Sequence, residues 1–255
     1  MRTLLLLVLM GLPLGGHAAE GHNECGQLAK CDPVKIDLRD QPSLQRGART
    51  FVNYCLPCHG ASYMRYNRMG QDLGIPEDLL KEDMIFTGDK VGDLMKTAMR
   101  KEDAKEWLKT APPDLTLVTR WRSPEWVYTY LRNFYRDDKS ASGWNNLVFP
   151  NVAMPHVLYE WQGELRPAQP TAQAQDGKPV EKTAPTSERL EVAKPGAKTA
   201  AEFDRDMRDL TNFLVYLGEP AKLDRYRIGV YVLIFLAVFL VFAYLLKKEY
   251  WKDVH

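Results

Sequence analysis

One pentapeptide constrains this chain of 255 residues more than any other feature: Cys-Leu-Pro-Cys-His at residues 55–59. The thiols of Cys55 and Cys58 can each form a thioether with one vinyl group of a haem, because the short turn between them fits the separation of the two vinyls. The adjacent imidazole of His59 can then turn toward the iron as its proximal ligand. The motif therefore predicts one covalently bound haem c.

The same two thiols leave other kinds of site open. A bare Cys-x-x-Cys also occurs in redox-active disulfides and in one half of a zinc site. The sequence holds four cysteines, and no second Cys-x-x-Cys is present to complete a zinc site. Haem attachment is the main prediction, with thiol redox chemistry as the alternative.

The N-terminus has the pattern of an export signal. Arg2 precedes an apolar run over residues 4–14, and small residues follow up to Ala19. This order of charge, apolar core and small residues is typical of a secretory signal peptide, with cleavage expected after Ala18. We therefore predict a signal peptide over residues 1–18, with an uncleaved anchor as the alternative. Export also places the thiols in a compartment where c-type haem is assembled.

A second apolar run lies near the C-terminus. Residues 228–246 contain no charged side chain, and at about 1.5 Å per residue they reach nearly across a hydrocarbon core of about 30 Å. Tyrosines and Trp251 flank the run, as is usual at membrane interfaces. We predict one transmembrane helix rather than a buried core helix. With the export signal, this places residues 19–227 outside the cytoplasm and residues 247–255 inside as a short tail.

Composition narrows the remaining possibilities. Lys and Arg total 34 against 33 Asp and Glu, so the electrostatic footprint of a nucleic-acid-binding protein is missing. Residues 167–201 contain five prolines and no aromatic residue, and this composition cannot offset the conformational entropy of ordering. We predict a disordered insertion over 167–201, within a single exported domain.

Helical periodicity brackets that domain. Ser43 is expected to cap a helix that continues to Tyr54, and a strong apolar stripe from Phe203 to Leu217 predicts a second helix that stops at Gly218. Residues 125–135 read as a further helix, and strand signals are few. The domain should be mainly α, while contact between the first and last helices stays open on periodicity alone.

A second axial ligand would decide between electron transfer and ligand chemistry at the iron. A thioether is a soft donor that raises the reduction potential of a haem. Met154, in the loop at residues 151–156, is the best-placed methionine, although methionines more often fill gaps in cores. His156, two residues further along, is its competitor.

Four segments together resemble a known family. They are CLPCHGASYMRYNRMGQDLGI at 55–75, APPDLTLVTRWR at 111–122, NVAMPH at 151–156, and the helix followed by a single span at the end. The chain is similar over nearly its whole mature length to cytochrome c1, the haem subunit of the ubiquinol:cytochrome c reductase (cytochrome bc1) complex, in its proteobacterial form. The resemblance implies a class I cytochrome c fold anchored in the bacterial inner membrane, a periplasmic haem domain, and an axial pair of His59 and Met154.

The resemblance also implies roles for further residues. The helix crossing of class I cytochromes would fall on Gly47, Phe51, Leu210 and Phe213, and small Gly47 would permit close backbone approach. A carbonyl in the turn at residues 112–115 would accept the Nδ1 proton of the proximal histidine. Arg120 matches the position that pairs with a haem propionate. Weaker expectations for haem contact fall on Tyr63 and Arg65.

The function implied is a relay of single electrons, with no bond made or broken on this chain. The donor would be a Rieske iron–sulfur protein and the acceptor a soluble cytochrome c, with cytochrome b as a further partner in the membrane. One alternative is an anchored haem donor to a terminal oxidase. Another is a haem sensor or peroxidase with an open sixth site.

Some features depart from the family pattern. The insertion at 167–201 has no counterpart, and Cys25 and Cys31 lie before the first helix. Export favours a disulfide between these two, with free thiols or a second metal site as alternatives. Residues 72–106 carry ten acidic against six basic side chains, which is typical of a solvated face and could also steer a basic cytochrome.

Overall fold

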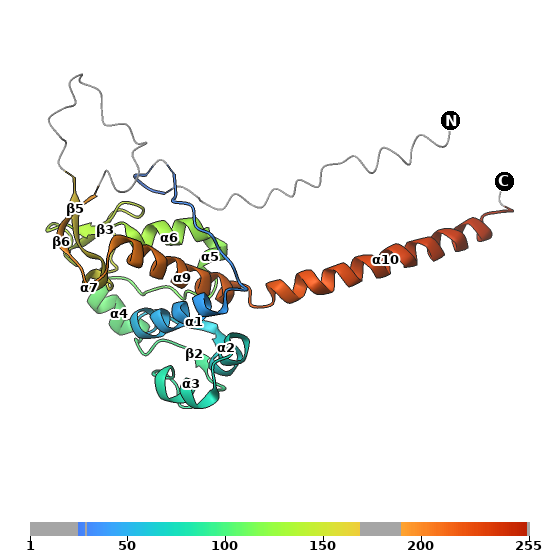
Figure 1. The fold of residues 1–255 in the computed structure, drawn as a ribbon, viewed down its shortest axis with the longest axis horizontal. Helices are drawn as coiled ribbons and strands as arrows, with labels where there is room; N and C mark the ends of the chain where they lie inside the picture. The colour runs from blue at the N-terminus through green and yellow to red at the C-terminus, as the bar shows by residue number, and fades with distance from the viewer. Residues whose placement is uncertain (1–24, 29, 169–189, 254–255) are drawn as a thin grey trace, which may run out of the picture.

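The computed structural model describes residues 25–28, 30–168 and 190–253. A helical domain with small two-stranded sheets occupies residues 25–218, and one long helix projects from it (Figure 1). The predicted signal peptide at residues 1–18 lies outside the described residues and stays a prediction.

Two helices from opposite ends of the domain form its centre. Helix α1 (Gln41–Thr50) lies against helix α9 (Ala200–Gly218), as Figure 1 shows. A Cβ atom on Gly47 would lie 2.2 Å from the carbonyl oxygen of Asp209, so only glycine permits this approach. The rings of Phe51 and Phe213 are 5.6 Å apart, and Leu210 is buried in the same core. The predicted helix crossing is confirmed.

The first helix begins earlier than expected. Asp40 is the N-cap of α1, and its carboxylate accepts a hydrogen bond of 3.1 Å from the backbone N–H of Ser43. Ser43 instead lies in the first turn and donates its hydroxyl to the buried carboxylate of Asp209 at 2.7 Å. The prediction that Ser43 caps the helix is therefore wrong, because Asp40 already supplies the cap and Ser43 serves the contact with α9.

Helix α1 does not end as an ordinary helix. It continues into a π-helical turn, η1 (Phe51–Cys55), in which the N–H of Leu56 bonds the carbonyl of Phe51 at 2.9 Å. Such single π turns are frequent at functional sites. The turn delivers Cys55 and the residues after it to one end of the helix pair.

Helix α6 (Pro124–Arg132) stands on the other side of α9. Ser123 is its N-cap and accepts a hydrogen bond of 3.1 Å from the N–H of Trp126. The helix predicted over 125–135 is present but ends three residues early, because Phe134–Arg136 pairs as a strand. The remaining helices of the domain are α2 (Tyr66–Leu73), α3 (Glu77–Asp83), α4 (Lys101–Leu108), α5 (Val118–Trp121) and α7 (Tyr159–Gln162).

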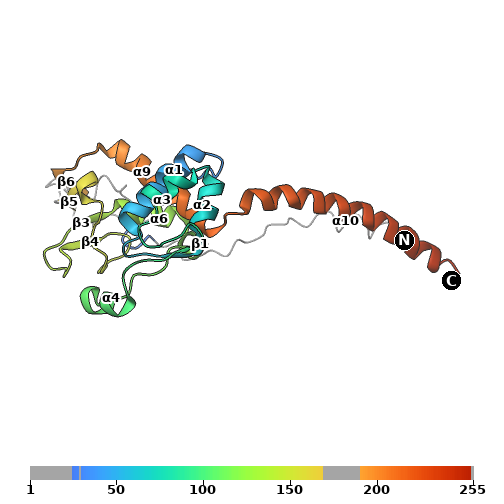
Figure 2. The same ribbon diagram turned by 90° about the horizontal axis from the view of Figure 1, so that it is seen from below.

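The strands of the described residues form three antiparallel pairs. Strands β1 (Ala61–Arg65) and β2 (Leu94–Met95) pair with each other. Helix α4 stands out from the domain at the lower left of Figure 2. The other pairs are β3 (Phe134–Arg136) with β4 (Trp144–Asn146), and β5 (Gly163–Pro167) with β6 (Leu190–Pro195). The prediction of a mainly α fold is confirmed.

The prediction of disorder over 167–201 is wrong for its described C-terminal part. Strand β6 pairs with β5, and Leu190 and Leu165 are both buried. Thr199 then caps α9, because its hydroxyl accepts from the N–H of Glu202 while the Glu202 carboxylate accepts from the N–H of Thr199. Backbone pairing and a capping box order these residues despite their low-complexity composition. Residues 169–189 lie outside the described residues.

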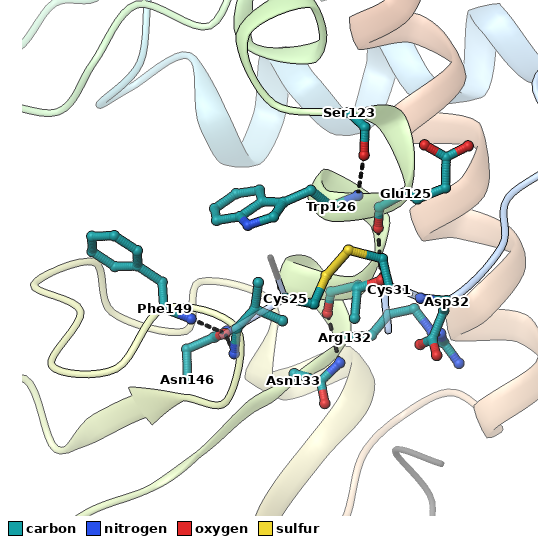
Figure 3. Close-up of a disulfide and its surroundings, with 12 residues drawn as sticks. Cys25, Cys31, Asp32, Ser123, Glu125, Trp126, Arg132, Asn133, Asn146 and Phe149 are labelled. Atoms are coloured by element: carbon teal, nitrogen blue, oxygen red, sulfur yellow. Dashed lines mark hydrogen bonds and ion pairs between the residues drawn. A yellow bond between two sulfur atoms is a disulfide. The ribbon is translucent and has the colours of Figure 1, made fainter. Parts of the chain in front are cut away.

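A disulfide joins Cys25 and Cys31, which confirms the expected pairing (Figure 3). Close to it, Arg132 on α6 pairs with Asp32 at 2.5 Å and with Asp204 on α9 at 2.6 Å. These contacts hold the N-terminal segment against both helices.

Helix α10 (Lys222–Tyr250) leaves the domain after Gly218. Its 29 residues, at about 1.5 Å each, give a length of roughly 43 Å. Among the described residues it is the helix long and apolar enough to cross a membrane, and its apolar window is fully exposed. It contains the predicted span at 228–246 and extends beyond it on both sides.

Candidate functional site

The Cys-x-x-Cys-His motif forms one tight turn at the end of η1. The N–H groups of Cys58 and His59 both bond the carbonyl of Cys55, at 3.0 and 2.7 Å. Cys55 and His59 are buried, Cys58 is half-buried, and both cysteines carry free thiols. Three of the predicted site residues are thus brought together by local backbone structure.

The environment of the thiols argues against redox chemistry. Burial, with a smaller effect of Cys58, raises the pKa of Cys55 to about 12, and burial also raises the pKa of Cys58. A redox-active Cys-x-x-Cys needs a lowered thiol pKa so that a thiolate can attack. No cluster of three His, Cys, Asp or Glu side chains suited to a metal ion occurs among the described residues.

The imidazole of His59 is fixed by the loop that begins at Pro112. Its Nδ1 lies 2.7 Å from the carbonyl oxygen of Pro113. Because a carbonyl can only accept, Nδ1 carries the proton and the lone pair of Nε2 is left for a ligand. Burial lowers the pKa of His59, while the bond to Pro113 and the charge of Asp114 oppose this, so the ring is neutral at pH 7. A carbonyl acceptor was expected within the turn at 112–115, and the structure shows that it belongs to Pro113.

Asp114 pins that loop to the residues after the motif. Its carboxylate accepts hydrogen bonds from the N–H of Ser62 at 2.8 Å and from the N–H of Thr116 at 2.9 Å. Partial desolvation alone would raise the pKa of Asp114, but these hydrogen bonds and the Thr116 hydroxyl bring it below its usual value. The N–H of Leu115 also bonds the carbonyl of Gly60 at 2.8 Å. The acceptor of the His59 proton is therefore held by several independent bonds.

Met154 lies on a separate segment of the chain. Its half-buried side chain packs against Phe134, Trp144 and Val152. The hydroxyl of Tyr130, on α6, donates a hydrogen bond to its sulfur atom at 3.3 Å. The thioether is thus held in place by a side chain that the sequence did not single out.

His156, the competitor of Met154, belongs to the aromatic core. It is only 3% exposed, its ring stacks on Phe134 at 4.9 Å, and the edge of Trp144 lies at 5.1 Å. Burial lowers the pKa of His156 to about 4. Its packing between rings favours Met154 as the ligand from this loop.

Two basic residues, Arg120 and Arg122, lie at the end of α5. Arg120 is exposed, and its Nη1 lies 3.5 Å from a carboxylate oxygen of Glu219. The guanidinium of Arg122 instead lies 4.3 Å from the ring centre of Trp121 and 4.7 Å from that of Trp126. Its Nε is buried without a hydrogen-bond partner among the described residues. Arg122 is thus better placed than Arg120 to bind an anion. In the sequence, the nearby tryptophans at positions 121 and 126 are the feature that could have drawn attention to it.

The weaker expectations for haem contact gain no support. The side chain of Tyr63 is 75% exposed. Arg65 donates from Nη1 to the carbonyl of Gly92 at 2.5 Å, which ties it to the loop before β2.

The residues of this site fit a c-type haem. Two free thiols lie on one turn beside a neutral imidazole whose Nε2 is available. The soft thioether of Met154 comes from another segment of the chain, so it could bind on the side of the haem opposite to His59. A buried, unpaired guanidinium nitrogen supplies a donor for a carboxylate.

Comparison with known proteins gives a consistent result. A family model described as Cytochrome C1 family matches residues 35–254. A cytochrome c1 of Allochromatium vinosum is 48% identical over the full length of both chains. A protein of Nitrosomonas europaea named ammonia monooxygenase gamma subunit is 46% identical over 98% of this chain and 97% of its own length. A cytochrome c1 of Rhodospirillum rubrum is 27% identical over 84% of this chain and 83% of its own.

The fold and the site define a c-type cytochrome with a C-terminal membrane anchor. With a family model that covers most of its length, the chain belongs to the cytochrome C1 family. It is a haem-containing electron-transfer subunit of the bc1 type.

Proposed function

We propose that this chain relays single electrons from a Rieske iron–sulfur protein to a soluble cytochrome c, within a quinol:cytochrome c reductase. The observation that carries the proposal is the imidazole of His59, which the Pro113 carbonyl holds with Nε2 available for iron. The two free thiols on the same turn and the family membership support it.

One haem c would be held by four side chains. Cys55 and Cys58 would each add across one vinyl group, which forms a carbon–sulfur bond and needs no oxidant. Nε2 of His59 and the sulfur of Met154 would be the axial ligands. When bound, the haem would supply a one-electron iron couple, and with His59 and Met154 as its ligands no position on the metal would be left for a substrate.

A propionate of the haem needs a cationic partner. The family resemblance implies that this partner is Arg120, which is exposed and lies within ion-pair distance of Glu219. We keep Arg120 as one candidate. Arg122 is the stronger candidate, because its buried Nε has no other partner among the described residues. Burial strengthens a charge-assisted hydrogen bond between guanidinium and carboxylate.

The anchor would fix the haem domain close to its partners. We propose that residues 19–227 are periplasmic, that α10 crosses the inner membrane once, and that residues 247–255 are cytoplasmic. Lys247 and Lys248 follow the apolar run, but Lys222, Arg225 and Arg227 precede it, so this orientation rests mainly on the export signal. Tethering raises the effective concentration of the partners without any new contact.

The acidic surface of α3 would attract the soluble cytochrome c that accepts the electron. Helix α3 exposes Glu77, Asp78, Glu82 and Asp83, and of these Glu77 is paired with Lys81. An excess of negative charge steers a basic partner and makes the association rate depend on salt.

Purification of the tagged full-length chain from native membranes tests the proposal. Cytochrome b and a Rieske protein should co-purify, and the complex should reduce a soluble cytochrome c when quinol is added. A chain that purifies without cytochrome b and Rieske protein would contradict it.

The same purification examines a second candidate. The name of the Nitrosomonas relative assigns that protein to an ammonia monooxygenase, and its identity over 98% of this chain favours considering such a complex here. Co-purification with monooxygenase subunits would support that role, in which the haem site would be used in the same way. If the chain is instead an anchored haem donor to a terminal oxidase, oxidase subunits should co-purify with it. Binding of carbon monoxide to the reduced native protein would indicate a sensor or peroxidase.

A further inference from the structure

Three aromatic rings form a ladder along one face of α6 and into β3. The ring of Trp126 stacks on Tyr130 with centres 5.0 Å apart, and Tyr130 and Phe134 meet edge to face with centres 5.1 Å apart. The spacing of four residues places successive rings on the same face of a helix. Tyr130 is thus held on both sides, which leaves its hydroxyl little freedom to change position.

The far end of this fixed ring meets Met154. The hydroxyl oxygen of Tyr130 lies 3.3 Å from the thioether sulfur, and the sulfur can only accept. The phenol O–H is the only proton-bearing group of the pair, so Tyr130 is the donor. Met154 and Tyr130 both pack against the cluster of Phe134, Trp144 and Val152, which contains the next ring of the ladder. The donor and the acceptor are therefore positioned by the same set of rings.

A thioether sulfur has two lone pairs. If one pair accepts the Tyr130 proton, the other is left for a metal, and the hydrogen bond withdraws electron density from the sulfur. A weaker electron donor at the axial position stabilises the ferrous state relative to the ferric state, which raises the reduction potential.

We propose that Tyr130 is a positioning residue that orients the sulfur of Met154 toward the haem iron and raises the reduction potential of the haem by hydrogen-bonding that sulfur. This inference rests on the proposed function, in which Met154 is an axial ligand. Tyr130 lies on α6, outside the two segments that carry the proposed ligands, so a residue of a third segment would help to set the reduction potential.

Tyr130→Phe in the full-length chain, purified in its complex, tests the proposal. The variant keeps the ring and its stacking and removes only the hydroxyl. We expect a lower reduction potential and a shifted or weakened thioether-to-iron charge-transfer band in the oxidised protein. Tyr128→Phe is the matched control: Tyr128 lies on the same helix, but its ring faces the guanidinium of Arg132 at 4.6 Å. The control should leave both readings unchanged.

Met154→Leu separates a failure of this inference from a failure of the proposed function. If Met154→Leu leaves the charge-transfer band in place, Met154 is not the ligand and the proposed site is wrong. If Met154→Leu abolishes the band while Tyr130→Phe leaves both the potential and the band unchanged, only the role of Tyr130 is contradicted. Loss of haem assembly in Tyr130→Phe would also contradict it, because the hydroxyl would then have a structural task.

Discussion

The Nδ1 atom of His59 lies 2.7 Å from the carbonyl oxygen of Pro113, and this bond determines which nitrogen is left to bind a metal. The acceptor is a backbone atom, so its position depends on what holds the loop rather than on one side chain. Asp114 is the residue that holds it, through hydrogen bonds from the N–H groups of Ser62 and Thr116.

Asp114→Ala should therefore raise the reduction potential of the haem. The variant loosens the acceptor of the His59 proton, which makes the imidazole a weaker donor, and it also removes a negative charge that favours the ferric state. We expect a rise of up to about 60 mV, equal to a tenfold change in a one-electron equilibrium, in a redox titration. Asp114→Asn keeps an acceptor oxygen and removes the charge, so it should give a smaller rise. An unchanged or lower potential in Asp114→Ala would show that the loop does not control the ligand.

Met154→Leu should lower the reduction potential, because the soft thioether is lost and the sixth position opens. The fall should be on the order of a few hundred millivolts, within the ~0.8 V range that axial ligands span. The reduced variant should also bind carbon monoxide, which the unaltered protein should not. A potential equal to that of the parent protein would mean that another residue is the ligand.

Gly47→Ala should destabilise the domain through the crossing of α1 and α9. The new Cβ would lie 2.2 Å from the carbonyl oxygen of Asp209 and 2.7 Å from the Cβ of Phe213, so the helices must move apart. Overpacking of this kind costs about 3 kcal/mol, seen as a lower Tm of the haem domain in detergent. Gly92→Ala is the control, since its Cβ would meet no atom within 4 Å. Equal melting temperatures for the two variants would contradict the close crossing.

Removal of the Cys25–Cys31 disulfide should weaken the attachment of the N-terminal segment to α6 and α9. In the double variant Cys25→Ser with Cys31→Ser, no disulfide restricts the unfolded chain. The free energy of unfolding should fall by about 2 kcal/mol, because the loop that the disulfide closes is short. With the iron reduced throughout, a thiol reductant should lower the Tm of the parent protein toward that of the double variant and leave the variant unchanged. If the reductant affects both proteins alike, the pair is not bonded in solution.

The sequence predicted those parts of the site in which a local motif fixes the chemistry. Cys55, Cys58 and His59 lie on one turn because the N–H groups of Cys58 and His59 both bond the carbonyl of Cys55, and the 112–115 turn contained the carbonyl that accepts from His59. The helix crossing was predicted through the family resemblance and not from periodicity, and the close approach of Gly47 to the Asp209 carbonyl gives its steric reason.

Contacts between distant segments could not be predicted in the same way. Tyr130 and Met154 are 24 positions apart, and their bond depends on how the 147–158 loop packs on α6. Arg122 was not singled out from the sequence: two tryptophans lie near it in the chain, but only the packing shows that its guanidinium lies over both rings. Disorder was predicted for residues 167–201 from composition, whereas the pairing of β6 with β5 within this range depends on backbone groups that composition does not report.

The central claim is that haem is bonded covalently to this polypeptide through Cys55 and Cys58. Extraction of the denatured full-length chain with acidified organic solvent, followed by a quantitative pigment spectrum of both phases, tests that claim most directly. The account predicts that the pigment stays with the polypeptide at one haem per chain and is released from the variant in which both cysteines are replaced by serine. Pigment that passes from the unaltered chain into the solvent would contradict it.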